Sequence, residues 1–424
     1  MRATTERRVR RWHEQRWLLD AVVQSVGMEW DQPRLAYTLL PCGPEAVGEM
    51  RAIGARVRKF ADMHRAFAAA ARRRQVRAEA YAQAGRMVSA RENWFVAALL
   101  YSAARWPIFE TNPSVLDYNA RMIACYGHYM AHAPRPTRRV EIPFGGHVLP
   151  GVLHLPREPA PGERFPCAIA IDGMDASKEI MVAMHGDKFL ERGFAVFAYD
   201  GPGQGECPIN GLFVTQSNHL DAALAVHGWL AGQSELDPAR MVVTGVSFGS
   251  YFGLQAAAAL GSRIAGSALA FVCHEGGLDT LMNAAAPSFK MRFMYMSGFE
   301  DEAAFDRFIA GFTLDPLLDR VAAPVLVLAG AEDELSPLEF TDLLMQRLSV
   351  RRRLVVYEGE RHAIGGNDGS SALGENWLTL LADWCVDRVN GRDAPVDRMS
   401  GREAPDERVF IDSLGREHAR PFGA

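Results

Sequence analysis

The sequence predicts an α/β fold in which a mostly parallel, doubly wound sheet follows an all-helical N-terminal region. Residues 1–136 carry apolar residues at helical spacing, and from residue 137 short apolar runs alternate with helical segments. Strands that alternate with helices form parallel sheets covered on both faces. Residues 245–249 read Gly-Val-Ser-Phe-Gly and lie between an apolar run and an alanine-rich segment that is expected to be a helix. This motif places a serine above the edge of such a sheet.

The N-terminal region is expected to form a helical cap domain over residues 1–136. Its helices are expected at residues 5–26, 44–74 (or two helices divided near Gly54), 76–104 and 114–131, and Pro134-Arg135-Pro136 marks the boundary. Residues 1–140 hold 23 Lys and Arg against 12 Asp and Glu, whereas the remainder holds 23 against 39. Because the arginines lie among alanines at helical spacing, a solvated helical face is favoured over a nucleic-acid interface. We therefore expect no nucleic-acid partner.

Residues 137–391 are expected to form the α/β domain. Strands are expected at residues 140–144, 147–155, 167–171, 194–199, 241–244, 266–272, 324–328 and 353–357, and helices at 177–192, 219–231, 252–260 and 372–389. The first two strands are joined by Gly145-Gly146, a hairpin turn, so the sheet begins with an antiparallel pair. Residues 392–424 hold few apolar residues and are expected to form a C-terminal tail that is mobile or lies over the surface.

The composition is that of a globular protein. The chain has 424 residues, of which 48% are hydrophobic and 23% charged, enough for one large domain with an additional unit or for two domains. No apolar run approaches the roughly 18 residues of a membrane span, and no apolar stretch of a secretory signal follows the basic N-terminus. The six cysteines are scattered without a CxxC pair, as in a reduced protein. We expect a cytoplasmic protein with no metal, no cofactor and no membrane partner.

Ser247 is the candidate nucleophile. The glycines two residues before and two residues after it leave room for a tight strand-to-helix turn, because neither carries a Cβ atom. The dipole of the following helix favours negative charge at this point. The motif is short, so a Gly/Ser turn that merely caps a helix is the alternative unless the chain also supplies a base, an acid and an oxyanion hole.

The candidate acid and base follow later strands. Asp333 comes after the apolar run 324–329, and His362 comes after the run 354–357. Functional groups on parallel sheets gather at the carboxyl ends of the strands, and the order serine, acid, histidine is that of α/β-hydrolases. His362 can take the proton of Ser247, because imidazole titrates near neutral pH, while Asp333 holds its other nitrogen.

Three further side chains compete for these roles, and a fourth is a candidate substrate contact. Glu332 and Glu334 flank Asp333 and are alternative acids, although the middle position matches the usual register of such loops. His274 is a second candidate for the base and could contact substrate. Glu275, just past a strand, could bind a substrate hydroxyl or amine, although an exposed loop carboxylate is the simpler interpretation.

An oxyanion hole needs two N–H groups directed at the developing negative charge. Phe248, the residue after the nucleophile, supplies one by position. The second is expected from the loop after residues 167–171, where the Met174 N–H is the first choice and the Gly173 N–H the next.

Three motifs carry a resemblance to a known family. Residues 173–179 read Gly-Met-Asp-Ala-Ser-Lys-Glu, Arg192-Gly193 precedes a strand, and residues 200–206 read Asp-Gly-Pro-Gly-Gln-Gly-Glu. Over residues 80–390 the chain resembles the α/β-hydrolase group that includes 2,6-dihydroxypseudooxynicotine hydrolase, the fungal polyketide-shortening hydrolases and the fermentation-respiration switch proteins. In the third motif the glycines and proline are expected to shape a tight turn beside the site, and its Asp200 and Glu206 are interpreted as structural.

The resemblance implies an α/β-hydrolase fold whose helical N-terminal unit closes over the site as a lid. It also implies a homodimer, and in several members the hydrolysis of a carbon-carbon bond beside a ketone. Members of the switch branch need not keep a working triad, but Ser247, Asp333 and His362 stand at the matching positions here. The chain departs from the group at Met174 and Ala176, where Leu and Ser or similar small residues are usual. These changes bear on the shape of the pocket and not on the triad.

Residues 274–320 form a long insertion between two strands. Its methionine and aromatic residues suit the apolar wall of a pocket for an aromatic or polyketide-like small molecule, or they simply bury the segment on the core. Three functions stay open: a carbon-carbon bond hydrolase acting on an aryl ketone or polyketide, a carboxylesterase, lactonase or acyltransferase, and a non-catalytic regulatory protein.

Overall fold

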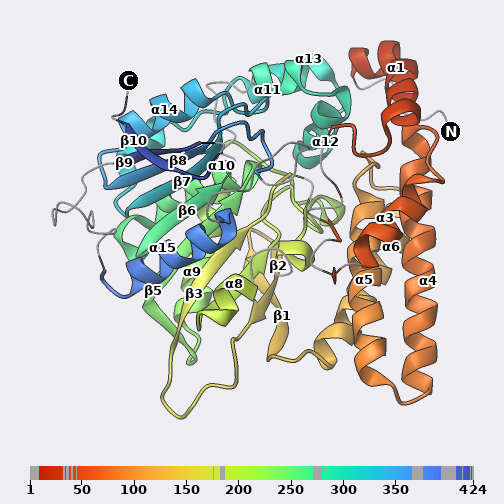
Figure 1. Ribbon diagram of the computed structural model, residues 1–424, viewed down its shortest axis with the longest axis horizontal. Helices are drawn as coiled ribbons and strands as arrows, with labels where there is room; N and C mark the ends of the chain where they lie inside the picture. Colours follow the sequence, from red (N-terminus) through yellow and green to blue (C-terminus); the bar gives the residue numbers. More distant parts are fainter. Residues whose placement is uncertain are drawn as a thin grey trace.

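The computed structural model describes residues 9–31, 34, 38–39, 42–43, 45–174, 176–181, 187–270, 279–364, 376–392, 407–412, 414–420 and 422. Its helical N-terminal region stands beside a large twisted sheet that carries helices on both faces (Figure 1). The predicted α/β fold with an N-terminal helical region is therefore confirmed.

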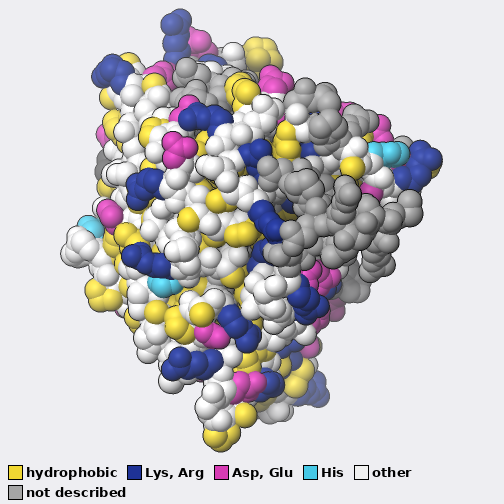
Figure 2. Space-filling model, turned by 90° about the vertical axis from the view of Figure 1, so that its left-hand side faces the viewer, with side chains coloured by type: hydrophobic (Ala, Val, Ile, Leu, Met, Phe, Trp, Pro, Cys, Tyr) yellow, Lys and Arg dark blue, Asp and Glu magenta, His cyan; other side chains and the backbone are white. Residues whose placement is uncertain are grey.

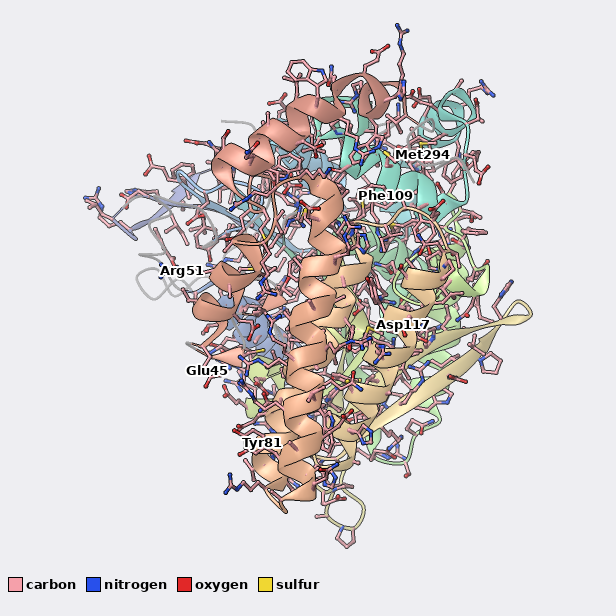
Figure 3. The ribbon with its side chains drawn as sticks, turned by 90° about the vertical axis from the view of Figure 1, so that its right-hand side faces the viewer. Glu45, Arg51, Tyr81, Phe109, Asp117 and Met294 are labelled. Carbon is pink, nitrogen blue, oxygen red and sulfur yellow. The ribbon has the colours of Figure 1, made fainter. Side chains whose placement is uncertain are left out.

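The N-terminal region is built around two long helices that pack along each other. Its elements are α1 (Arg10–Val26), α3 (Glu45–Gly54), η3 (Phe60–Asp62), α4 (Met63–Gln83), α5 (Met87–Arg105) and α6 (Pro113–Ala131). Alanines on the facing sides of α4 and α5, such as Ala70 and Ala97, are fully buried and allow close contact. Figure 3 views this region face-on, with Glu45 and Arg51 on α3 and Asp117 on α6.

The predicted division between helices at residues 74–76 is wrong, because α4 continues to Gln83. Residues 74–76 contain neither glycine nor proline, so nothing there ends a helix. The helix ends two residues before Gly85, whose φ of 71° is a left-handed conformation that favours glycine. The Arg86 N–H then donates to the Tyr81 carbonyl at 2.8 Å, which closes the last turn.

The sheet has ten strands in the order β1-β2-β4-β3-β5-β6-β7-β8-β9-β10. The first eight are β1 (Thr137–Phe144), β2 (His147–His154), β3 (Phe165–Ile171), β4 (Ala195–Tyr199), β5 (Leu236–Val246), β6 (Gly266–Ala270), β7 (Val325–Gly330) and β8 (Arg352–Tyr357). The strands β1 and β2 form the predicted antiparallel hairpin, turned by Gly145 (φ 53°) and Gly146 (φ 81°). From β4 to β8 all neighbours are parallel, so their carboxyl ends share one edge.

Helices cover both faces of this sheet. They are α7 (Lys178–Met181), α8 (Asp187–Glu191), α9 (Asn218–Ala231), α10 (Phe248–Leu260), α14 (Leu338–Arg347) and α15 (Trp377–Val389). Side chains of α8 and α15 bury one face, and those of α9, α10 and α14 bury the other, beside the N-terminal region. The insertion between β6 and β7 adds α11 (Asp279–Ala284), α12 (Pro287–Ser297), α13 (Glu302–Ile309) and η8 (Asp315–Arg320).

Part of the predicted C-terminal tail is folded into the sheet. Residues β9 (Glu407–Ile411) pair in parallel with β8, and β10 (Glu417–Arg420) pairs antiparallel with β9. Val409 and Ile411 are buried in the same cluster as α15. The prediction of a surface tail is therefore wrong for these residues. Their apolar run is short, and the composition of residues 392–424 as a whole is polar.

The surface away from the N-terminal region carries mixed charge. Figure 2 shows Lys and Arg side chains interspersed with Asp and Glu there. Among the helices of the described ranges, none is both long enough and apolar enough to cross a membrane.

A buried histidine at the end of β2 makes the stability of the fold sensitive to acid. Burial, and to a lesser degree Arg135, lowers the pKa of His154 to about 3. The unfolded chain binds this proton below about pH 6.5 while the folded chain does not, so stability falls as the pH drops below that value. Between pH 7 and pH 5 this histidine alone should cost about 2 kcal/mol. His154→Leu should lose about 2 kcal/mol less than the wild type over this interval, measured by urea unfolding at each pH.

An equal loss of stability in wild type and variant would contradict this role of His154. Wild type and variant share all other titrating groups, so the contributions of those groups cancel in the comparison.

Candidate active site

Ser247 stands at a strained turn between β5 and α10. Its φ of 55° is the only positive value at a non-glycine residue in the part of the chain that the structure describes. A Cβ atom at Gly245 would lie 2.2 Å from the Gly249 carbonyl oxygen, and one at Gly249 would lie 2.3 Å from the Ile171 carbonyl oxygen. Both positions therefore require glycine, and the turn they permit holds Ser247 in a conformation that costs energy and recurs at functional sites.

The structure brings Ser247, His362 and Asp333 together in one hydrogen-bonded chain. Ser247 Oγ lies 2.8 Å from His362 Nε2, and His362 Nδ1 lies 3.0 Å from each carboxylate oxygen of Asp333. Asp333 and His362 are buried, with 6% and 4% of their surfaces exposed. Their loops follow β7 and β8, so three separate strand ends supply the three side chains.

Asp333, and not its acidic neighbours, is the carboxylate that meets the imidazole of His362. Its Oδ1 accepts hydrogen bonds from the N–H groups of Leu335 (2.9 Å) and Ser336 (2.8 Å), which fix the carboxylate. Glu334 instead accepts a hydrogen bond of 3.3 Å from the main-chain N–H of His362.

Two of the three residues expected at the oxyanion hole, Phe248 and Gly173, lie next in sequence to Ser247 or against it. Phe248 begins α10 directly after it. Gly173 lies against the nucleophile, because a Cβ atom there would be 3.5 Å from Ser247 Cβ and 3.3 Å from the Val246 carbonyl oxygen. Met174 follows Gly173 and is buried. This arrangement could present N–H groups to an oxygen bound at Ser247.

A buried charge cluster lies next to the oxyanion loop, the segment between β3 and α7 that holds Gly173 and Met174. The Lys178 amine is fully buried and lies 2.9 Å from Asp200, 2.5 Å from Glu206 and 2.9 Å from Glu179. The main-chain N–H groups of Lys178 and Glu206 also donate to Asp200, each at 3.0 Å. Arg139 on β1 binds Glu206 through two hydrogen bonds of 2.8 and 2.9 Å. The cluster thus ties the loop after β3 to the loop after β4.

Mutual attraction favours the charged forms of Lys178 and Glu206. Burial alone lowers the pKa of Lys178, but attraction to its three carboxylates outweighs burial and the pKa lies above its ordinary value. Lys178 and Arg139 likewise overcome burial and hold the pKa of Glu206 below its ordinary value. These contacts support the interpretation of Asp200 and Glu206 as structural. No role for Lys178 was predicted from the sequence, because its partners Asp200 and Glu206 lie more than 20 positions away.

Asp172 differs from these carboxylates. It is fully buried between β3 and Gly173, and neither carboxylate oxygen has a hydrogen-bond partner among the described residues. Burial, and then the nearby Asp200, raises the pKa of Asp172 well above its usual range, which favours its neutral form.

Two of the expected substrate contacts fall outside the described residues. His274 and Glu275 lie in the segment 271–278, between β6 and α11. In the described part of the insertion, Phe293 on α12 packs against Phe248 with ring centroids 4.7 Å apart, and Met291 and Met294 are fully buried.

The N-terminal region contacts both the insertion and the oxyanion loop. The Arg11 guanidinium donates to the carbonyls of Met282 (2.9 Å) and Ala285 (3.0 Å) at the end of α11. Ser102 Oγ on α5 lies 3.0 Å from Ser177 Oγ, next to Lys178. Helices α1 and α5 of the N-terminal region therefore contact the insertion and the loop that holds Gly173 and Met174, respectively.

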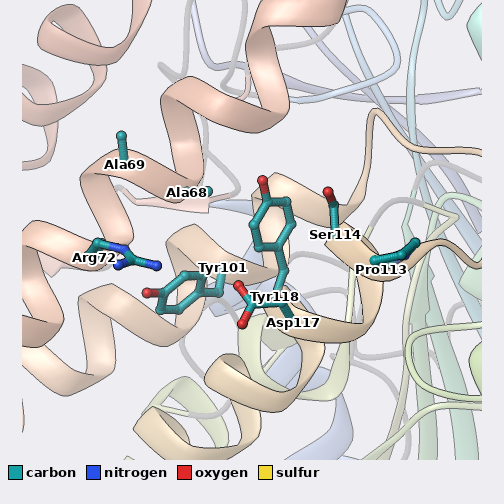
Figure 4. A pocket seen from close by; sticks show the side chains of 8 residues that line it. All are labelled: Ala68, Ala69, Arg72, Tyr101, Pro113, Ser114, Asp117 and Tyr118. Atoms are coloured by element: carbon teal, nitrogen blue, oxygen red, sulfur yellow. The ribbon is translucent and has the colours of Figure 1, made fainter.

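A separate pocket of about 440 Å³ opens within the N-terminal region. Figure 4 shows the side chains around it, which are those of Ala68, Ala69, Arg72, Tyr101, Pro113, Ser114, Asp117 and Tyr118. It shares no lining residue with the site at Ser247.

Comparisons with known proteins identify similar hydrolases. Residues 183–391 match the model of the prolyl oligopeptidase family. Hydrolase LUC6 of a Fusarium species is 38% identical over 131 residues, which are 29% of this chain and 30% of that protein. The 2,6-dihydropseudooxynicotine hydrolase of Paenarthrobacter nicotinovorans is 26% identical over 275 residues, 63% of this chain and 69% of that protein.

The curated relatives and the solved structures cover different shares of the chain. Three of the curated fungal relatives are matched over only 30%, 46% and 32% of their own length. The crystal structure of 2,6-dihydroxy-pseudo-oxynicotine hydrolase superposes with a TM-score of 0.71 at 23% identity, covering 87% of this chain and 97% of that one, so the shared fold includes the N-terminal region. The chain therefore has the α/β-hydrolase fold, and its sequence is similar to 2,6-dihydropseudooxynicotine hydrolase and to the fungal hydrolases.

Proposed function

We propose that the chain is a serine hydrolase that cleaves a carbon-carbon bond beside a ketone in an aryl ketone or polyketide-like small molecule. The observation that carries the proposal is the continuous chain of hydrogen bonds from Ser247 Oγ through His362 to Asp333. In serine hydrolases this arrangement deprotonates the serine as it attacks a carbonyl carbon.

The three side chains have complementary tasks in this reaction. His362 Nε2 accepts the proton of Ser247 while Oγ bonds to the ketone carbon, and Asp333 stabilises the imidazolium that results. The oxygen of the tetrahedral adduct is held by the N–H groups of Phe248 and Met174, with Gly173 as the alternative. When the carbon-carbon bond breaks, its electron pair leaves with the departing carbon, and the imidazolium protonates it. Water activated by His362 then releases the acid from Ser247.

The departing carbon must be stabilised, as it is beside a second carbonyl or within a hydroxylated aromatic ring. A relative named 2,6-dihydropseudooxynicotine hydrolase supports the ketone substrate. Aromatic packing of the insertion on Phe248 supports an apolar pocket next to the nucleophile. An ester would be cleaved by the same residues, because an alkoxide leaves more easily than a carbanion.

Labelling with a fluorophosphonate tests the nucleophile. We expect intact-mass measurement to show one adduct on the wild type and none on Ser247→Ala, because only an activated serine reacts rapidly with this reagent. Turnover of β-diketones and of 4-nitrophenyl esters would then be compared on the wild type. Cleavage of the diketones supports the proposal, whereas cleavage of esters alone would identify a carboxylesterase.

The absence of an adduct on folded wild type would overturn the enzyme proposal and favour a regulatory protein. Folding of Ser247→Ala is checked by its thermal unfolding, so that a missing adduct is not caused by a collapsed site.

A further inference from the structure

The side chain of Gln204 joins the two loops that meet behind Ser247. It is fully buried, and its Nε2 donates to the Asp172 carbonyl at 2.5 Å and to the Gly173 carbonyl at 3.2 Å. Its Oε1 accepts a hydrogen bond of 3.2 Å from the Gly201 N–H. All three contacts are to main-chain groups, so the amide acts on the path of the backbone.

Holding a carbonyl also fixes the N–H of the same peptide unit. In a trans peptide the C=O and N–H point in opposite directions, and the described residues contain no cis peptide bond. By holding the carbonyls of Asp172 and Gly173, Gln204 turns the N–H groups of Gly173 and Met174 away from itself. These are the two groups expected to complete the oxyanion hole, and Gly173 lies directly against Ser247.

We propose that Gln204 is a positioning residue that orients the oxyanion-hole N–H groups of Gly173 and Met174. This inference rests on the proposed hydrolase function. An amide suits the task because it donates to two carbonyls and accepts from one N–H without carrying charge. A carboxylate would repel both carbonyls.

The surroundings hold Gln204 in one place. A Cβ atom at Gly201 would lie 2.9 Å from Gln204 Oε1 and 2.5 Å from His219 Cε1, so the loop after β4 packs closely around the amide. The far end of the oxyanion loop is held independently, because the Lys178 N–H donates to Asp200. Loss of the Gln204 amide should therefore release only the peptide units next to Ser247.

Two substitutions separate orientation from folding. Gln204→Met keeps the length of the side chain but removes its hydrogen bonds. Gln204→Glu can donate to a carbonyl only when it is protonated. Gln255→Met is the matched control, because Gln255 is also buried and donates to a main-chain carbonyl, that of Gln216, at 2.8 Å. The hydrolysis of 4-nitrophenyl acetate would be followed from pH 5.5 to 8.5, with the melting temperature of each protein.

Gln204→Met should lower kcat about 10- to 100-fold with little change in KM. Misplaced N–H donors weaken the stabilisation of the charged transition state, whereas the binding of the uncharged substrate depends little on them. Gln255→Met should keep kcat within about twofold of the wild type. The activity of Gln204→Glu relative to the wild type should rise as the pH falls, whereas that of Gln204→Met should stay constant. This pH signature is not expected of a residue that serves only for folding.

If the wild type is active and kcat is unchanged in Gln204→Met, the inference about Gln204 is wrong while the proposed function stands. Equal losses of kcat in Gln204→Met and Gln255→Met would have the same meaning. If Gln204→Met does not fold, the pH dependence of Gln204→Glu decides, and a flat activity ratio counts against the proposal. A wild type that neither hydrolyses the ester nor reacts with a fluorophosphonate would overturn the proposed function, and this inference with it.

Discussion

Replacing Asp333 with asparagine should lower kcat about 10⁴-fold while the fold persists. The N–H groups of Leu335 and Ser336 both donate to Asp333 Oδ1, so an asparagine would keep its oxygen there and turn its NH₂ group toward His362. An NH₂ group facing Nδ1 favours the tautomer that carries its proton on Nε2, the atom that must accept the proton of Ser247. The negative charge that stabilises the imidazolium is lost as well.

The measurement is kcat for 4-nitrophenyl acetate, with the melting temperature as a check on folding. Glu334→Gln is the matched control, because Glu334 accepts a hydrogen bond from the main-chain N–H of His362. We expect it to retain activity within about threefold, since it changes neither the tautomer nor the charge beside the ring. Equal losses in the two variants would contradict the assignment of Asp333 as the acid.

Replacing Lys178 with methionine should reduce the free energy of unfolding by about 3–5 kcal/mol. The substitution removes the cation that Asp200, Glu206 and Glu179 share, and the side chains of all three acids are at least 96% buried. Arg139 still pairs with Glu206, but Asp200 and Glu179 must either stay charged in the interior without this cation or take up protons, and both outcomes favour the unfolded chain. The midpoint and slope of urea unfolding report the loss.

Lys290→Met provides the comparison. The Lys290 side chain is also buried, at 2% exposure, but its partners Glu302 and Asp306 are 26% and 47% exposed. Water can solvate these two acids after the amine is removed, so a loss of about 1 kcal/mol is expected. Equal losses of unfolding free energy in Lys178→Met and Lys290→Met would show that the burial of the acids does not determine how much the lysine stabilises the fold.

The candidate triad could be predicted because each member follows closely after the apolar stretch that ends a strand. Strands such as β7 and β8 are buried on both faces and stand out in the sequence, and the parallel order sets their carboxyl ends at one edge. Once the strands were located, the positions of Asp333 and His362 followed from the chain order alone.

Other features depend on contacts between distant segments, which no local pattern encodes. The cluster around Lys178 requires the loops after β3 and β4 to approach each other, and Gln204 acts on carbonyls about 30 positions away in the chain. The apolar run of β9 is only three residues long, Val409 to Ile411, and stands in an otherwise polar segment. The end of α4 does have a local signal, since Gly85 follows it, but the predicted division at residues 74–76 has none.

The last two strands have a consequence for the behaviour of the protein in solution. Without β9, the strand β8 would present its unpaired main-chain groups and the apolar side chains of Leu354 to Val356 at an open edge. Exposed apolar edges recruit strands from other molecules, whereas the present outer strands, β1 and β10, carry several charged residues that discourage such pairing. Residues 407–420 thus protect the protein from self-association, and truncation before them is expected to yield an aggregating product even though all three triad side chains remain.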